Sequence, residues 1–70
     1  MRELSITTDA IKLGQLLKLA NVVEAGADAK QLLSTGGVTV NGLTETRRGR
    51  QLAAGDVVAV GSAEIRLTRP

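Results

Sequence analysis

The 70-residue sequence predicts a small α+β domain, with an N-terminal strand and two short helices packed on a small, mainly antiparallel β-sheet. Three patterns lead to this class. Apolar and polar residues alternate near the N-terminus, apolar residues recur at helical spacing between about residues 9 and 35, and alternation returns between turn signals from residue 38 onward. An order of strand, helices and several strands is typical of α+β architecture. The length indicates one domain, residues 1–70.

The N-terminal segment predicts a strand followed by a helix. Residues 2–7 alternate polar and apolar side chains, which is the pattern of a half-buried strand. Thr8 or Asp9 is expected to cap a helix that runs to about Ala20, because either side chain can accept the free backbone amides of a first helical turn. The apolar residues of this helix fall on one face: Leu13, Leu16, Leu17 and Ala20.

A second helix is expected over residues 27–35. Leu32 and Leu33 lie on its buried face with Ala29, and Lys30 flanks that face. Gly36 and Gly37 follow, and glycine just past the last helical residue is typical of a left-handed cap.

The remaining residues predict two hairpins. Residues 38–40 form a strand, and Asn41-Gly42 is the strongest hairpin dipeptide because both positions of its turn need a positive φ. The return segment runs from Leu43 toward Leu52. After a turn at residues 55–56, residues 57–60 and 63–68 make the second hairpin.

Missing residue types exclude several classes of function. The chain has no Cys and no His, which removes thiolate nucleophiles, zinc-thiolate sites and the commonest general base. The carboxylates are scattered over turns and strand ends, with no pair suited to acid–base catalysis. We expect no enzyme activity, no cofactor and no metal. No apolar run is long enough to cross a bilayer, and the N-terminal Met-Arg-Glu segment has no apolar signal-peptide core, so a cytoplasmic protein is expected.

Basic residues are concentrated in the middle of the chain. The formal net charge is only +2, but the excess lies between residues 12 and 50. Three arginines in four positions make it locally dense. The basic residues of this stretch are Lys12, Lys18, Lys30, Arg47, Arg48 and Arg50. Such cations on a rigid surface can follow the phosphates of a folded RNA by displacing its counterions.

An ordered set of short motifs covers most of the chain. They are Lys12-Leu13, Ala29-Lys30-Gln31-Leu32-Leu33, Val38-x-Val40-Asn41-Gly42 and Asp56-Val57-Val58. In this order and spacing they resemble the αL RNA-binding motif of the family named for ribosomal small-subunit protein S-four, with the motif core at about residues 12–60. Residues 45–48, Glu-Thr-Arg-Arg, and the absence of a second domain look most like its stand-alone bacterial branch, the YbcJ/YaaA type.

Two positions depart from the family pattern. Gly14 stands where the family commonly has Asp, and Ala25-Gly26 stands where it commonly has Ser/Thr-Arg. The second departure removes an arginine that the resemblance assigns to phosphate contact. The resemblance therefore shifts that role to Lys30 and the arginine cluster.

The residues and the resemblance together predict a non-catalytic RNA-binding protein. Its substrate is expected to be structured RNA, either ribosomal RNA or transfer RNA, because the chain has no aromatic residue on which to stack a single-stranded base. A monomer that associates with RNA, and with the ribosome, is expected, without a membrane or small-molecule partner. The predicted RNA contacts are Lys12, Lys30, Arg47, Arg48 and Arg50, with Asn41 and Lys18 as secondary ones.

Other interpretations are open for the same residues. The arginines could protect an exposed strand edge against aggregation. The lysines could be ordinary solvent-facing helix residues, and Asn41 could serve its turn alone. A protein-interaction module that docks an acidic partner would use the same surface. A β-grasp carrier has a similar size, but it needs a C-terminal Gly-Gly, whereas this chain ends Leu-Thr-Arg-Pro.

Overall fold

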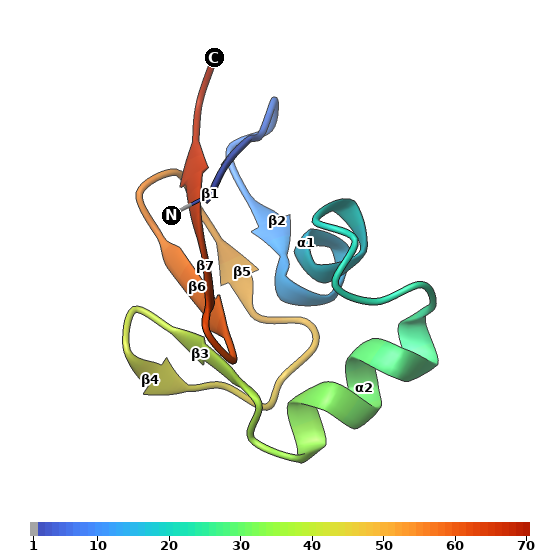
Figure 1. Ribbon diagram of the computed structural model, residues 1–70. Coiled ribbons are helices and arrows are strands. Elements are labelled where there is room, and N and C mark those ends of the chain that lie inside the picture. The colour runs from blue at the N-terminus through green and yellow to red at the C-terminus, as the bar shows by residue number, and fades with distance from the viewer. Residues whose placement is uncertain (1) are drawn as a thin grey trace.

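The structure, a computed structural model, describes residues 2–70 and contains two helices beside a twisted sheet (Figure 1). Along the chain the elements are β1 (Arg2–Ser5), β2 (Ile11–Lys12), α1 (Leu13–Leu19), α2 (Gly26–Ser34), β3 (Val38–Val40), β4 (Leu43–Thr44), β5 (Gln51–Leu52), β6 (Val57–Val60) and β7 (Ala63–Thr68). In this part of the chain, five strands form one sheet in the order β1-β7-β6-β3-β4, and β2 pairs with β5 in a separate short ladder. β1 is parallel to β7, whereas the other pairs are antiparallel. The predicted class and the mainly antiparallel sheet are confirmed.

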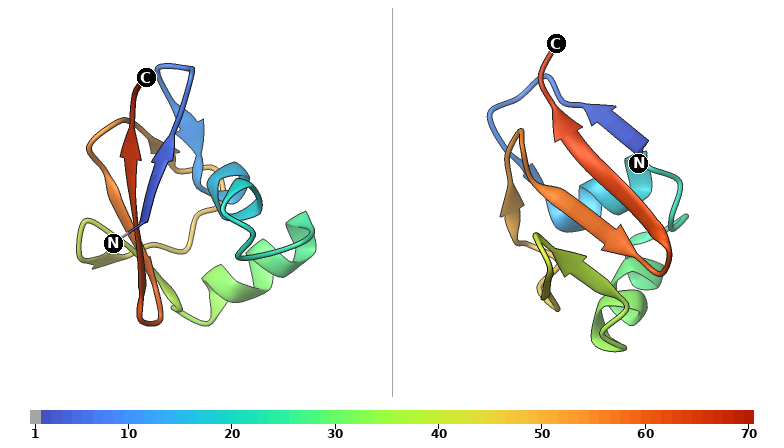
Figure 2. Two further views of the ribbon diagram at one scale, coloured as in Figure 1. Left: turned by 45° about the horizontal axis from the view of Figure 1, so that its top comes forward. Right: turned by 60° about the vertical axis from the view of Figure 1, so that its left-hand side comes forward.

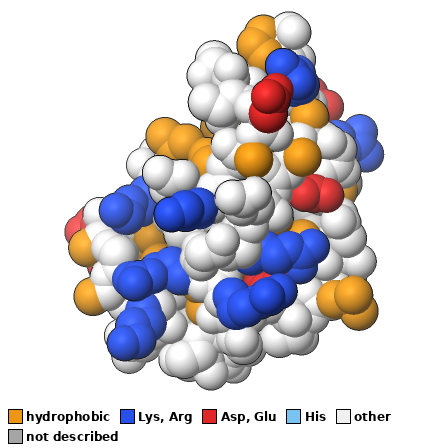
Figure 3. All heavy atoms as spheres, turned by 180° about the vertical axis from the view of Figure 1, so that it is seen from behind, with side chains coloured by type: hydrophobic (Ala, Val, Ile, Leu, Met, Phe, Trp, Pro, Cys, Tyr) orange, Lys and Arg blue, Asp and Glu red, His pale blue; other side chains and the backbone are white. Residues whose placement is uncertain are grey.

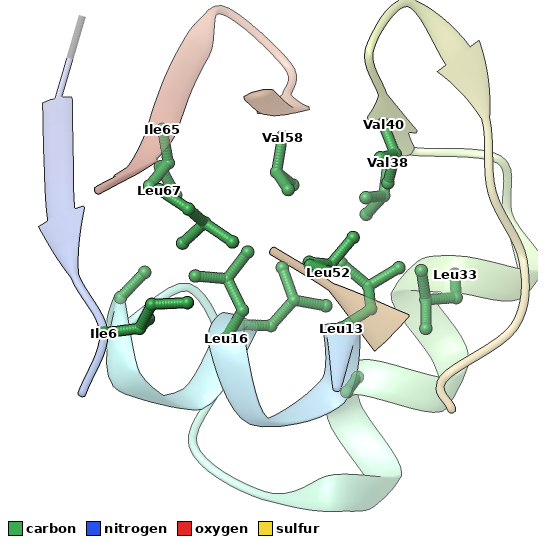
Figure 4. Close-up of a cluster of buried hydrophobic side chains, with 13 residues drawn as sticks. Ile6, Leu13, Leu16, Leu33, Val38, Val40, Leu52, Val58, Ile65 and Leu67 are labelled. Carbon is green, nitrogen blue, oxygen red and sulfur yellow. The ribbon is translucent and has the colours of Figure 1, made fainter. Parts of the chain in front are cut away.

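The core lies between one face of the sheet and the two helices. Both helices are on the same side of the sheet, as the left view of Figure 2 shows. Leu13 and Leu16 of α1 point toward Val58 and Leu67 of the sheet (Figure 4), and all four side chains are buried. The core consists of aliphatic side chains only, so its stability depends on close packing of Leu, Val, Ile and Ala.

The first helix begins later than its sequence predicts. Residues 11–12 are β2, paired in an antiparallel ladder with β5, and α1 starts at Leu13. Thr8 and Asp9 therefore do not cap it. The Thr8 hydroxyl instead donates to the backbone oxygen of Ala10 at 2.7 Å, and the Asp9 carboxylate pairs with Arg69 at 3.2 Å. A long-range ladder thus replaces the expected first turn.

The second helix ends as predicted. The amide of Gly36 donates to the backbone oxygen of Leu33 at 3.1 Å, and that of Gly37 donates to the oxygen of Leu32 at 3.4 Å. Gly36 has a φ of +78°, so these two bonds form a Schellman cap. Neither helix of residues 2–70 is long and apolar enough to span a membrane.

The predicted Asn41-Gly42 hairpin turn is confirmed, and its asparagine makes a further connection. Asn41 and Gly42 have φ values of +51° and +87°, which the turn between β3 and β4 requires. The Asn41 side chain donates to the Asp56 carboxylate at 3.0 Å and accepts the Val57 amide at 2.9 Å. Asn41 therefore ties the tip of the first hairpin to the start of β6.

The packing of the core predicts that two leucines of α1 contribute very differently to the free energy of unfolding. Leu16 is fully buried, whereas Leu19, three residues further on, is 59% exposed. We expect Leu16→Ala to lower the free energy of unfolding by about 2–5 kcal/mol, through lost apolar contact and a cavity. Leu19→Ala, the matched control, should change it by less than about 0.5 kcal/mol. Urea denaturation followed by circular dichroism measures both, and equal losses would contradict this packing.

Candidate nucleic-acid interface

The arginine cluster lies in the loop between β4 and β5, residues 45–50, and is held around one carboxylate. Glu45 is only 6% exposed, and its oxygens accept five hydrogen bonds from the loop itself. The Arg47 guanidinium donates to both oxygens, each at 3.2 Å, and Arg50 donates to one of them at 2.9 Å. The amides of Thr46 and Arg47 complete the set, each at 3.0 Å. Glu45 therefore fixes the course of the loop.

This pairing changes the acidity of the carboxyl group. Hydrogen bonds from the side chains of Arg47 and then Arg50 favour the ionised form and hold the pKa of Glu45 far below its usual range. The same pair raises the pKa of Arg47. Both groups are therefore charged at neutral pH, and the Glu45 carboxylate offsets part of the positive charge of the cluster.

The other side of the loop is bonded to the first turn of α1. The Leu13 amide donates to the backbone oxygen of Arg50 at 2.8 Å, and the Gly14 amide donates to that of Arg48 at 3.0 Å. These bonds continue the direction of the β2–β5 ladder. Side-chain hydrogen bonds to Glu45 thus hold the loop together, and its backbone oxygens bond it to the start of α1. Because Arg47, Arg48 and Arg50 lie in this loop and not in a strand, edge protection does not account for them.

Arg48 lies in a shallow groove between the two helices, which we call the α1–α2 groove. It has a volume of about 340 Å³, and its lining includes Lys12, Gly14, Lys18, Gly26, Arg48 and Gly49. A Cβ atom at residue 14 would stand 2.7 Å from Cγ of Arg48, and one at residue 26 would stand 3.7 Å from its Nη1. The Arg48 side chain therefore runs over Gly14 toward Gly26. These glycines are the positions at which the chain departs from the αL pattern.

The structure brings together three of the predicted RNA contacts and separates the others. Lys12, Lys18 and Arg48 line the α1–α2 groove, and within residues 2–70 none of them has an ion-pair partner. Lys30 is exposed on α2, next to Ala29 of the lining, and it too is unpaired among these residues.

The remaining predicted contacts have protein partners. Arg47 and Arg50 are paired with Glu45, and Asn41 is bonded to Asp56 and Val57. Sequence reasoning missed Glu45 as the centre of the loop and the glycines as the surface under Arg48. The position of Glu45, two residues before Arg47 and five before Arg50, was the available signal for the first. No sequence signal pointed to the glycines under Arg48, because Gly14 and Arg48 come together only in the folded chain.

The basic side chains gather on one face of the molecule. Figure 3 views the protein from behind Figure 1, and several lysine and arginine side chains lie across the middle and lower part of that face, with little acidic surface among them. A concentration of one sign of charge on one face raises the local potential and attracts a polyanion.

Comparison with known proteins shows the family of this domain. Residues 4–68, nearly the whole chain, match the family model for the S4 domain. The chain belongs to the S4-domain family. S4 domains are RNA-binding and non-catalytic, so RNA is the partner of this domain and no enzyme activity is assigned to it.

Two relatives of this S4 domain are close to it in size. It is 51% identical over 57 residues to the probable ribosome maturation protein RlbA of Bacillus subtilis (strain 168), covering 81% of this chain and 80% of that one. The solution structure of YbcJ from E. coli, described as having an αL motif involved in RNA-binding, matches with a TM-score of 0.67 and 31% identity. That match covers 96% of this chain and 84% of YbcJ. The predicted resemblance to αL-motif proteins of the YbcJ type is confirmed.

The Glu45 cluster predicts a specific loss of stability in acid. A carboxyl group whose pKa falls on folding stabilises the fold above its unfolded pKa, about 4.3, and this contribution is lost as the pH falls below that value. We expect Glu45→Gln to lower the free energy of unfolding at pH 7, because Arg47 and Arg50 lose their charged partner. The difference from the wild type should shrink at pH 3.

Urea denaturation at the two pH values measures this difference. Glu64→Gln is the matched control, since Glu64 is exposed and forms no ion pair within residues 2–70. A Glu45→Gln deficit that stays the same at both pH values would show that the charge of Glu45 does not stabilise the loop.

Proposed function

We propose that this S4 domain binds structured RNA, namely ribosomal or transfer RNA, through the basic surface around the α1–α2 groove. The observation that carries the proposal is the set of unpaired cations on that surface. Lys12, Lys18 and Arg48 line one groove, and Lys30 lies on the adjoining helix. Their charges are free to replace the counterions of an RNA backbone.

The shape of the surface favours folded RNA over a single strand. Single-strand readers stack bases on aromatic side chains, and this chain has no Phe, Tyr or Trp. The groove offers guanidinium and ammonium groups on a rigid helix and loop, which can match the phosphate geometry of a folded RNA. Arg47, Arg50 and Asn41 belong to the same proposed surface as secondary contacts, since each already has a protein partner.

The relatives support ribosomal RNA as the first RNA to test. RlbA is named as a probable ribosome maturation protein, and it shares half of its aligned residues with this chain. We extend that role to this protein as a proposal: it acts as a monomer in the cytoplasm and associates with ribosomal RNA during ribosome maturation.

Binding should depend strongly on salt. For a polyanion, the logarithm of the association constant falls linearly with the logarithm of salt concentration, by about 0.7–0.9 per neutralised phosphate. We expect purified ribosomal RNA to bind the protein more weakly as salt rises from about 50 to 200 mM. The triple variant R47A/R48A/R50A should bind more weakly and with a shallower salt slope. Filter binding measures both quantities.

Two comparisons make the result specific. Arg66→Ala, which removes an exposed cation of β7 outside the groove, should leave affinity and slope almost unchanged. A single-stranded oligouridylate of similar length should bind more weakly than ribosomal or transfer RNA. Affinity that is indifferent to salt, or equal for the wild type and the triple variant, would refute the proposal. A partner retained after nuclease treatment of the cell extract would favour the protein-interaction alternative.

A further inference from the structure

The three arginines of the loop differ in what their guanidinium groups contact. Arg47 and Arg50 donate to the buried carboxylate of Glu45 at 2.9–3.2 Å. Moving either guanidinium away from Glu45 would remove one of the partners of a buried acid, which is costly. The Arg48 guanidinium has no hydrogen-bond or ion-pair partner anywhere in residues 2–70. Of the three, Arg48 is the one whose whole guanidinium group is free among the described residues, whereas Arg47 and Arg50 already use part of theirs on Glu45.

Neighbouring residues fix the position of Arg48, although its guanidinium group has no protein partner among the described residues. Its backbone oxygen accepts the Gly14 amide at 3.0 Å, and its Cγ would be 2.7 Å from a Cβ at residue 14. Any other residue at position 14 would therefore collide with the base of the Arg48 side chain. Absence of a side chain at residue 14 lets Arg48 lie across the groove toward Gly26, where Lys12 and Lys18 contribute to the same lining.

We propose that the α1–α2 groove is a binding site for one phosphate group of the RNA backbone. Arg48 binds the phosphate, and Gly14 leaves the space that the Arg48 side chain occupies. This inference rests on the proposed RNA binding and names the atoms that carry it. The guanidinium presents paired N–H donors that match two phosphate oxygens, which an ammonium group cannot do. A side chain already laid in the groove loses little conformational freedom on binding. Arg47 and Arg50 are positioning residues that keep the loop in place.

The first test removes Arg48 and its neighbours one at a time. Ribosomal RNA that binds the wild type is the probe, in filter binding at several salt concentrations. Arg48→Ala should weaken binding by about tenfold or more, the usual effect of losing a charge-assisted hydrogen bond. Its salt slope should fall by about one. Arg48→Lys should recover only part of the affinity, because it restores the charge without the paired donors.

The second test uses the glycine under Arg48. Gly14→Ala should weaken binding severalfold, because its Cβ would displace the Arg48 side chain. Urea denaturation checks that the variant remains folded. Gly26→Ala is the matched control: its Cβ would meet Arg48 at 3.7 Å, an ordinary contact, so affinity should be unchanged. In a protein that already carries Arg48→Ala, adding Gly14→Ala should have no further effect on RNA binding. That lack of additivity distinguishes displacement of Arg48 from direct obstruction of the RNA by the new methyl group.

Nuclear magnetic resonance gives a readout that loop stability alone does not move. On addition of the same RNA, the Nε–Hε resonance of Arg48 should shift, and those of Arg47 and Arg66 should shift less. If the wild type binds RNA but Arg48→Ala binds equally well, the proposed phosphate-binding site is wrong and the proposed function stands. The proposed phosphate-binding site is also wrong if Gly14→Ala lowers RNA affinity equally in the wild type and in the Arg48→Ala variant. If the wild type shows no salt-dependent binding, the proposed function itself fails.

Discussion

The buried carboxylate of Glu45 is the constraint on which the proposed RNA-binding surface depends. A six-residue loop with three arginines would repel itself and sample many conformations in the absence of a counter-charge. Glu45 removes that problem by accepting five hydrogen bonds within the loop. The acid does not weaken the site, because it neutralises charge on the arginines that brace the loop and leaves Arg48 free. Order in the loop and exposed positive charge therefore come from the same residue.

The shape of the α1–α2 groove depends on glycine residues. The α1–α2 groove exists because glycine lines it at three positions, so that backbone lies where side chains would otherwise fill the gap between the helices. Only Gly14 is under strict steric demand, since a Cβ at residues 26 or 49 would meet nothing closer than 3.7 Å. The space over Gly14 is occupied by a side chain from another part of the chain, Arg48. The groove thus combines two cations of the α1 region, Lys12 and Lys18, with one from a loop that is distant in sequence from both helices.

Features fixed by local chemistry could be predicted, whereas those that depend on distant contacts could not. The Asn41-Gly42 turn and the Gly36 cap follow from backbone angles that few residues adopt, and the sequence alone located both. The start of α1 was misplaced because Thr8 and Asp9 are good capping residues, and nothing nearby indicates that residues 11–12 pair with β5. The same limit applies to the site. The density of arginines was visible in the sequence, but the different contacts of Arg47, Arg48 and Arg50 depend on tertiary structure.

The side chain of Asn41 has a consequence for chemical ageing of the protein. An Asn-Gly sequence in a flexible chain deamidates readily, because the glycine amide can attack the side-chain carbonyl and close a succinimide ring. Here the carboxamide is held at both ends, by Asp56 and by the Val57 amide, and the turn fixes the backbone on either side. Ring closure must first break these contacts, so damage at this site requires local opening of the hairpin. A deamidated Asn41 would place a second carboxylate beside Asp56, so the reaction would also oppose reclosure of the turn.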